Sequence, residues 1–202
     1  MIANPSYTYI SPEDYLQGEA TSPIKHEYRQ GEVYAMAGAS NTHVIIAGNL
    51  FARLRNHLRG RGCQAYISDT KAHIESRNIY YYPDVIVSCD QRDRAFENFI
   101  RYPCLIIEVL SPSTEAFDRG DKFADYRHIE SLQEYVLVSQ NRISIDCFRR
   151  NQDGQWVLYP YVKEQEIHLA SIDFRCAIAD VYEDVTFELP QPPAAQTPPI
   201  MP

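Results

Sequence analysis

The sequence lacks several segments that would place it in a common class of protein. It has no run of about 18 apolar residues, which a membrane-spanning helix requires. Residues 1–5 contain neither the basic stretch nor the apolar stretch of a secretory signal. The motifs GxxxxGK(S/T), GxSxG and HExxH are absent, and no GxGxxG follows a strand. We therefore expect a cytoplasmic protein without a membrane partner, and neither a nucleotide-loop enzyme nor a serine hydrolase.

Cysteine is scarce, and its spacing is irregular. The five cysteines are Cys63, Cys89, Cys104, Cys147 and Cys176. Their number is odd, no CxxC pair occurs, and most of them lie in apolar segments, where a reduced thiol behaves as a small hydrophobic side chain. We therefore predict neither disulfide bonds nor a zinc–thiolate site.

Basic residues are the minority charge. The chain has 19 lysines and arginines against 27 acidic residues, a net charge of −8. Proteins that bind nucleic acid mainly through its phosphates usually carry a basic excess, so tight non-specific binding is not expected. A local patch is still available, or else a solvated helix face, at Arg53, Arg55, Arg59 and Arg61.

The 202 residues are 45% hydrophobic and 23% charged, which is typical of a single globular domain with its own core. Six of the last fourteen residues, 189–202, are proline. Proline at this density interrupts both helices and sheets. We therefore predict a folded domain over residues 1–188 and a proline-rich flexible tail over 189–202.

Hydrophobic periodicity predicts helices alternating with strands. Helices are expected after the cap Ser11, over 40–58 and over 113–129, and a hairpin over 27–37 turns at Gln30-Gly31. Further strands are expected over 64–74, 80–89, 104–110, 134–139, 142–149 and 155–162. This order predicts an α/β (α+β) fold, with a central mixed β-sheet flanked by helices.

Two acidic residues stand in positions that call for an explanation. Asp84 follows Pro83 at the start of an apolar strand, where a nearby loop could also satisfy it. Glu108 lies inside the apolar run of residues 104–110, and burying an ionised carboxylate is costly unless it is paired or binds a cation. A salt bridge would explain Glu108, and so would a metal.

Considered together, Asp84 and Glu108 could aim two hard oxygen ligands at one point. Mg²⁺ is commonly held by one or two carboxylates, several waters and the phosphate of a substrate. The two residues therefore indicate a Mg²⁺ or Mn²⁺ site for phosphoryl chemistry.

An aspartate after proline, followed some twenty residues later by an acid in an apolar strand, resembles the PD-(D/E)XK nuclease superfamily. The closer resemblance is to the Uma-type family of restriction endonucleases, small bacterial proteins with a restriction-endonuclease-like fold. It rests on four segments and covers roughly residues 7 to 187: HEYRQGEVYAMAGASNTH (26–43), YYYPDVIVSCD (80–90), LIIEVLSPST (105–114) and DRGDKFADYRHIESLQEYVLV (118–138).

The resemblance implies that Asp84 and Glu108 are metal ligands and catalytic residues. It also implies a lysine two residues after Glu108, where this chain has Leu110. Lys122 is the best substitute and Lys71 the second, although Lys122 could simply pair with Asp118 one helical turn away.

The resemblance adds two further candidates for the site. Glu27 would be an additional acid ahead of the core, and otherwise a surface carboxylate at a strand start. His43 would also belong to the site, although it shares a helix face with Ala47 and Leu50, as a core histidine would.

Two functions remain open on the sequence. The first is a Mg²⁺- or Mn²⁺-dependent endonuclease that hydrolyses DNA, binds it weakly through a local basic patch and acts as a homodimer by analogy with restriction-like enzymes. The second is a non-catalytic protein that keeps the fold as a binding or assembly module. The acidic balance and Leu110 favour the second function, whereas the three acids and Lys122 favour the first.

Overall fold

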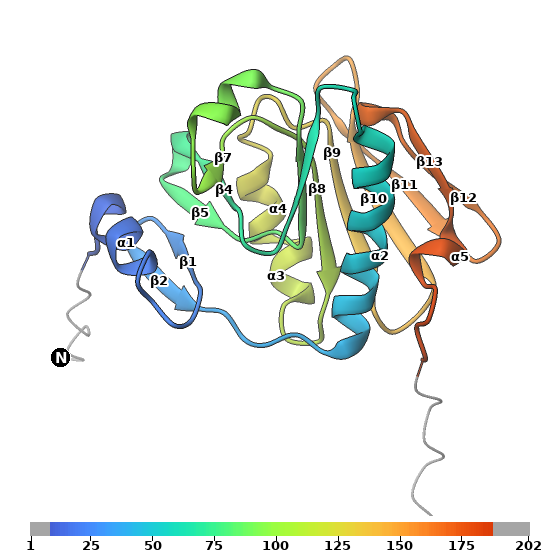
Figure 1. Cartoon of the computed structure of the whole chain (residues 1–202), viewed down its shortest axis with the longest axis horizontal. Helices are drawn as coiled ribbons and strands as arrows, with labels where there is room; N and C mark the ends of the chain where they lie inside the picture. Colours follow the sequence, from blue (N-terminus) through green and yellow to red (C-terminus); the bar gives the residue numbers. More distant parts are fainter. Residues whose placement is uncertain (1–8, 188–202) are drawn as a thin grey trace, which may run out of the picture.

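A six-stranded mixed sheet forms the centre of the protein in the computed structural model, which describes residues 9–187 (Figure 1). Its strand order is β11-β10-β9-β8-β6-β3. Within it β8 and β9 are parallel, and the other neighbours are antiparallel. The strands of this sheet are β3 (Gln64–Ile67), β6 (Val85–Ser88), β8 (Pro103–Leu110), β9 (Glu134–Ser139), β10 (Ser144–Arg150) and β11 (Trp156–Val162).

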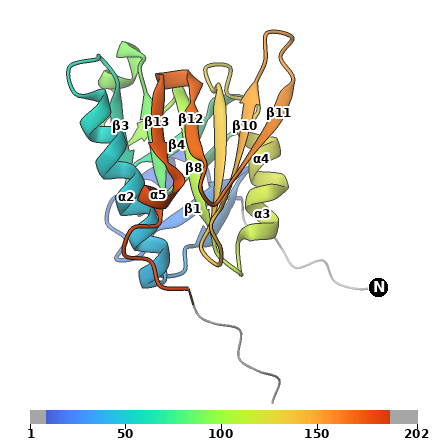
Figure 2. The same ribbon diagram turned by 90° about the vertical axis from the view of Figure 1, so that its right-hand side faces the viewer.

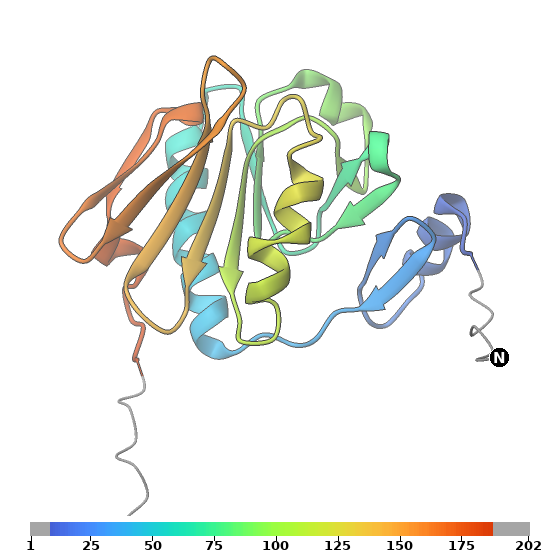
Figure 3. The same ribbon diagram turned by 180° about the vertical axis from the view of Figure 1, so that it is seen from behind.

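Helices cover both faces of this sheet. Alternate residues of β8 point to opposite faces, and each set packs against the helices on its own side. Leu105 and Ile107 pack against α2 (Asn41–Leu58), beside which lie β12 (Glu166–Leu169), β13 (Phe174–Ala177) and α5 (Ile178–Val181) (Figure 2). Ile106 and Leu110 face the other side, where α3 (Glu115–Arg119) and α4 (Asp121–Tyr126) lie (Figure 3). The predicted α+β fold, a mixed sheet flanked by helices, is confirmed.

The long helix α2 agrees closely with its sequence pattern. The Ser40 side chain caps its N-terminus by accepting a hydrogen bond from the amide of His43 at 3.1 Å. Its apolar stripe is buried against the sheet through Leu50 and Leu54. The helix ends at Leu58, just before Gly60.

A second sheet of five strands lies beside the first, in the order β2-β1-β5-β4-β7. The predicted hairpin is confirmed as β1 and β2, whose turn residues Gln30 and Gly31 both have positive φ. The predicted first helix is α1 (Pro12–Glu19), capped by Ser11. The strands of this sheet are β1 (His26–Arg29), β2 (Glu32–Ala35), β4 (Lys71–Ile74), β5 (Ile79–Tyr81) and β7 (Phe99–Ile100).

Two predicted strands are wrong as single elements. Residues 64–74 divide into β3 and β4, and residues 80–89 divide into β5 and β6. In each case the chain leaves one sheet and enters the other, first at Ser68, which has a φ of 55°, and then at Pro83. The hydrophobic pattern continues through both breaks because both sheets are buried there.

The predicted helix over 113–129 is also wrong as a single element. It divides into α3 and α4 at Gly120, whose backbone passes so close to the preceding turn that a Cβ would lie 3.0 Å from the Ala116 carbonyl oxygen. The strands β12 and β13 and the helix α5 had no counterpart in the sequence prediction. The predicted domain end and proline-rich tail at 189–202 lie outside the described residues. None of the helices within residues 9–187 combines the length and apolarity that a membrane span needs.

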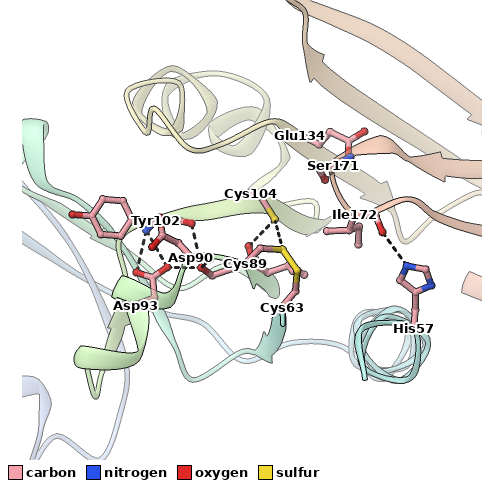
Figure 4. The surroundings of a disulfide bond; sticks show 12 residues. His57, Cys63, Cys89, Asp90, Asp93, Tyr102, Cys104, Glu134, Ser171 and Ile172 are labelled. Atoms are coloured by element: carbon pink, nitrogen blue, oxygen red, sulfur yellow. Dashed lines mark hydrogen bonds between the residues drawn. A yellow bond between two sulfur atoms is a disulfide. The ribbon is translucent and has the colours of Figure 1, made fainter. Parts of the chain in front are cut away.

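The prediction that no disulfide forms is contradicted, because the structure bonds Cys63 to Cys89 (Figure 4). The two residues are 26 apart in sequence, but β3 and β6 pair antiparallel with Gln64 opposite Ser88. One further step along this register places Cys63 directly opposite Cys89. Cys104, Cys147 and Cys176 are free thiols, as predicted.

Glu134 is a fully buried carboxylate that joins the central sheet to the C-terminal strands. It accepts hydrogen bonds from Arg149 Nε at 2.8 Å and from the amides of Ala170 and Ser171 at 3.0 and 2.9 Å. The Ser171 hydroxyl adds a bond of 2.6 Å. These donors therefore all bond to one buried negative charge, which strengthens their hydrogen bonds.

We predict that Glu134→Gln lowers the free energy of unfolding by about 3 kcal/mol, because it leaves buried donors without an acceptor. Urea denaturation measures this change. Glu166→Gln is the matched control, since its exposed pair with Arg175 contributes about 0–1 kcal/mol. Equal losses in the two variants would contradict a structural role for Glu134.

Candidate active site

Asp84 and Glu108 lie opposite each other on neighbouring strands. Val85 pairs with Ile107 in the antiparallel β6–β8 ladder, and one further step places Asp84 across from Glu108. The Asp84 Oδ2 atom accepts a hydrogen bond from the backbone amide of Val109 at 2.7 Å. The two acids that the sequence singled out are therefore held together by the sheet itself.

Lys122 lies among three carboxylates. Its Nζ is 2.9 Å from Glu108 Oε1, 3.0 Å from Glu27 Oε1 and 3.7 Å from Asp118 Oδ1. Only 7% of the lysine side chain is exposed. Lys122 therefore brings a buried positive charge to Glu108 from a helix, whereas the position two residues after Glu108 is occupied by the buried, apolar Leu110.

Both short helices contribute to the surroundings of Lys122. Asp118 belongs to α3, and Tyr126 belongs to α4 and donates a hydrogen bond from its hydroxyl to Glu108 Oε1 at 3.1 Å. Asp118 and Tyr126 lie four residues before and after Lys122, a spacing that predicts a shared helix face. Their four-residue spacings were the available signal, but they could not show that this face is buried against Glu108.

Glu27 connects the second sheet to the site. Besides its contact with Lys122, its Oε1 atom accepts a hydrogen bond from the backbone amide of Tyr82 at 3.1 Å. Its side chain is 14% exposed. The alternative of a surface carboxylate therefore does not hold.

His43 lies in the first turn of α2 and reaches Asp84. Its Nε2 atom is 2.8 Å from Asp84 Oδ1, so each Asp84 oxygen has a partner. Its Nδ1 atom is buried and has no hydrogen-bond partner within residues 9–187. His43 therefore adjoins the acidic cluster rather than serving only as a core residue of α2.

Lys71, the second candidate for the missing lysine, lies elsewhere. It is buried in β4 with its Nζ 5.0 Å from the centre of the Tyr82 ring, and burial lowers the pKa of its ammonium group. No salt bridge within the described residues joins it to Asp84 or Glu108. The geometry therefore favours Lys122.

The cluster contains more negative than positive charge, with Glu27, Glu108 and Asp118 around one lysine and Asp84 near Glu108. Burial raises the pKa of Glu108 well above its ordinary value; Lys122 opposes this shift, and the neighbouring carboxylates add to it. Burial would lower the pKa of Lys122, but the charges of Glu108, Glu27 and Asp118 outweigh it and raise that pKa well above its ordinary value. Lys122 is therefore cationic at neutral pH.

The carboxylates of Asp84 and Glu108 are oxygen donors of the kind that Mg²⁺ and Mn²⁺ take. The described residues contain no group of three or more His, Cys, Asp or Glu side chains arranged to hold a metal, and Lys122 Nζ stands where the oxygens of Glu27 and Glu108 converge. Mg²⁺ does not require a complete protein cage, since waters and phosphate oxygens fill its remaining positions. The excess of buried carboxylates supplies the charge that such a cation would neutralise.

The candidate basic patch lies away from this cluster. Arg53 is paired with Asp180 and Glu183. Arg55 and Arg59 are exposed in the last turn of α2 and just beyond it, whereas His43 is in the first turn. Twelve residues of helix separate Arg55 from His43, a distance of about 18 Å.

The fold is that of a restriction-endonuclease-like protein. It matches a solved structure from Anabaena variabilis, described as "a putative nuclease belonging to DUF820", with a TM-score of 0.69. The match covers 86% of this chain and 98% of that chain at 16% sequence identity.

The sequence identifies the family. Residues 12–179 match the model of the Uma2 family, described as "Putative restriction endonuclease", and the chain belongs to this family. Two Synechocystis proteins, slr1290 and sll1609, both described as uncharacterized, are similar to it. The first is 45% identical over 178 residues, which is 88% of this chain and 94% of that protein. The second is 34% identical over 168 residues, which is 82% of this chain and 92% of that protein.

We predict that Lys122→Met lowers the free energy of unfolding in EDTA by about 3–5 kcal/mol, because it leaves the surrounding carboxylates buried without a cation. Glu108→Gln should be neutral or slightly stabilising, since Lys122 keeps Glu27 and Asp118 and one repulsive charge disappears. Thermal and urea melts in metal-free buffer measure both effects. If Glu108→Gln is as damaging as Lys122→Met, a simple ion pair and not an excess of negative charge governs the site.

Proposed function

We propose that this protein is a metal-dependent endonuclease that hydrolyses phosphodiester bonds of DNA. One observation carries the proposal: Asp84 and Glu108, on adjacent strands, lie in one buried cluster with a lysine from α4. Membership of a family described as restriction endonucleases supports the same reaction class.

Asp84 and Glu108 are the proposed ligands of the metal, Mg²⁺ or Mn²⁺. A bound ion of this kind lowers the pKa of its water and neutralises charge on the phosphoryl oxygens. The chain fixes both carboxylates before any ligand arrives. The Val109 amide and His43 hold Asp84, and the Tyr126 hydroxyl holds Glu108.

Lys122 would act as a fixed positive charge. Because its pKa is raised by the surrounding carboxylates, it cannot accept a proton from water at neutral pH. It can donate hydrogen bonds to an attacking water or to a phosphoryl oxygen, and so orient the one or stabilise charge on the other. Glu27, from β1, assists by holding the ammonium at 3.0 Å.

His43 would act through Asp84. Its hydrogen bond to Oδ1 fixes the orientation of that carboxylate, and its buried Nδ1 atom has no partner within the described residues. A histidine in contact with a metal ligand is a frequent arrangement for setting ligand orientation and charge.

A non-catalytic module with the same fold is the rival proposal, and the acidic balance and Leu110 favour it. A homodimer is proposed by analogy alone, since restriction-like folds commonly pair as dimers to cut two strands. Size-exclusion chromatography with light scattering decides whether the protein forms a dimer in solution.

We predict that the purified protein cleaves supercoiled plasmid DNA with Mn²⁺ and not with EDTA. Asp84→Asn and Glu108→Gln should each lower the cleavage rate at least about a hundredfold, because either change removes a metal ligand. Glu166→Gln, an exposed acid of β12, is the control and should cleave normally. If the parent protein binds no Mn²⁺ by calorimetry and leaves the plasmid intact, the enzyme proposal fails and the rival is favoured.

We predict further that binding of duplex DNA is weak and strongly salt-dependent. With a net charge of −8, contact must come from a local basic surface that neutralises few phosphates. Arg55→Glu combined with Arg59→Glu tests whether α2 provides it, with fluorescence anisotropy at 50 and 150 mM salt as the measurement. An unchanged affinity would mean that this end of α2 is only a solvated surface.

A further inference from the structure

Three sulfur atoms meet at the end of the central sheet opposite to the carboxylate cluster. Cys63 and Cys89 are bonded, and the Cys104 sulfur lies 3.7 Å from that of Cys89. In Figure 4 the three sulfurs lie in a row with that of Cys89 in the middle. Attack of a thiolate on a disulfide requires its sulfur to approach the bonded sulfur it will join, and Cys104 is already there.

A bulge in β8 places Cys104 in this position. Val87 pairs with Leu105 and Ser88 pairs with Pro103, so Cys104 is an extra residue in the ladder. It consequently points to the α2 side of the sheet, where it packs in the same cluster as Cys63. Without the bulge, strict alternation would send the Cys104 side chain to the α3–α4 side.

Cys63 lines a basic pocket. Three arginines, Arg55, Arg59 and Arg94, line a cavity of about 280 Å³ with Cys63. All three are exposed, and none is paired with a carboxylate in the part of the chain that the structure describes, in contrast to Arg53 and Arg92. Their charges would attract an anionic ligand and stabilise a Cys63 thiolate.

The surroundings distinguish the three cysteines. Burial raises the pKa of Cys104 to about 11, and its thiol donates a hydrogen bond to the Val87 carbonyl at 3.5 Å. Cys104 is therefore a protonated reserve thiol at neutral pH. Cys89 is the more exposed residue of the bonded pair, and Cys63 is partly buried beside the arginines, so the arginine pocket makes Cys63 the entry point for an anionic reagent.

We propose that Cys63, Cys89 and Cys104 form a thiol–disulfide exchange site for an anionic low-molecular-weight disulfide, bound by the arginines beside Cys63. The inference does not depend on the nuclease proposal, because it uses none of the residues of the carboxylate cluster. It gives a function to the three sulfurs, which DNA hydrolysis does not require, and it assigns Arg55 and Arg59 a small anionic ligand in place of DNA phosphates.

The exchange balances without any further reagent. In the reduced protein, the Cys63 thiolate attacks the external disulfide, forms a mixed disulfide and releases one external thiol. The Cys89 thiolate then attacks the Cys63 sulfur and releases the second, so two protein thiols are oxidised and one external disulfide is reduced. Finally Cys104 loses its proton to solvent and attacks the Cys89 sulfur, and Cys63 leaves as the thiolate that the arginines stabilise.

The test uses the reduced full-length protein and glutathione disulfide as the probe. Samples are quenched with acid, alkylated and mapped by peptide mass spectrometry. Wild-type protein should first carry glutathione on Cys63 and then form the Cys63–Cys89 bond. Cys89→Ser should stop at the Cys63 mixed disulfide, and Cys63→Ser should form Cys89–Cys104 instead. Cys176→Ser, a free cysteine of β13, is the control and should behave as wild type.

The arginine pocket is tested by the charge of the reagent. Arg59→Gln combined with Arg94→Gln should slow oxidation by glutathione disulfide roughly tenfold, since exposed charge contacts each contribute only a few-fold. Oxidation by the cationic disulfide cystamine should not slow in this variant. Equal rates for the two reagents in wild-type protein would overturn the pocket as the binding site.

Two results would overturn the exchange site itself. One is that Cys104 in oxidised Cys63→Ser remains as open to alkylation as in the reduced protein, with circular dichroism showing an intact fold. The other is that glutathione modifies Cys176 of the wild-type protein as fast as Cys63. The second measurement needs no variant, so misfolding of a mutant cannot obscure it.

Discussion

The structure depends on one buried lysine. Lys122 lies within hydrogen-bonding distance of Glu27 and Glu108 and close to Asp118, which come from β1, β8 and α3. Buried carboxylates and a buried ammonium are each costly alone, and their contacts offset that cost only when the geometry is kept. The need to keep these contacts therefore joins the second sheet, the central sheet and the α3–α4 pair at one point. It also explains why a protein with an acidic excess can bury so many acids in one place.

The same two strands carry both chemically distinctive regions. Asp84 precedes β6 and Cys89 follows it, while Cys104 and Glu108 lie near opposite ends of β8. Five residues of extended chain separate Asp84 from Cys89, about 17 Å. The regular part of the β6–β8 ladder aligns the two carboxylates, and the irregular part brings the Cys104 sulfur to Cys89. The β6–β8 pair thus contributes to the geometry of both regions, and the β3–β6 pairing adds Cys63 to the second.

A helix, strand or hairpin could be predicted from the sequence wherever its own residues determine it. The helix α2, the β1–β2 hairpin and the strand β9 follow from caps, turn residues and periodicity. The apolar context of the strands singled out Asp84 and Glu108, the family resemblance added Glu27 and His43, and the structure brings them together with Lys122. The rest depends on tertiary pairing. At Ser68 and Pro83 the chain passes from one buried sheet to the other, and the strands on both sides of each break are similarly apolar. Similarly, the Cys63–Cys89 bond follows from strand pairing across 26 residues, which spacing alone does not reveal.

The lysine from α4 changes how the site is assembled. A lysine on β8 would share the rigid strand of Glu108, whereas here Leu110 fills that position and packs beneath α4. The ammonium depends instead on where α4 begins, and Gly120 sets that point because its backbone passes too close to Ala116 for a side chain. Asp118, before Lys122 in the chain, contacts its ammonium, and Tyr126, after it, bonds to Glu108, so both residues hold the helix against the site. The carboxylates are therefore positioned by sheet register, but the positive charge between them is positioned by helix packing. Because the two depend on different contacts, a change in the α3–α4 packing would displace the lysine while leaving Asp84 and Glu108 paired across the strands.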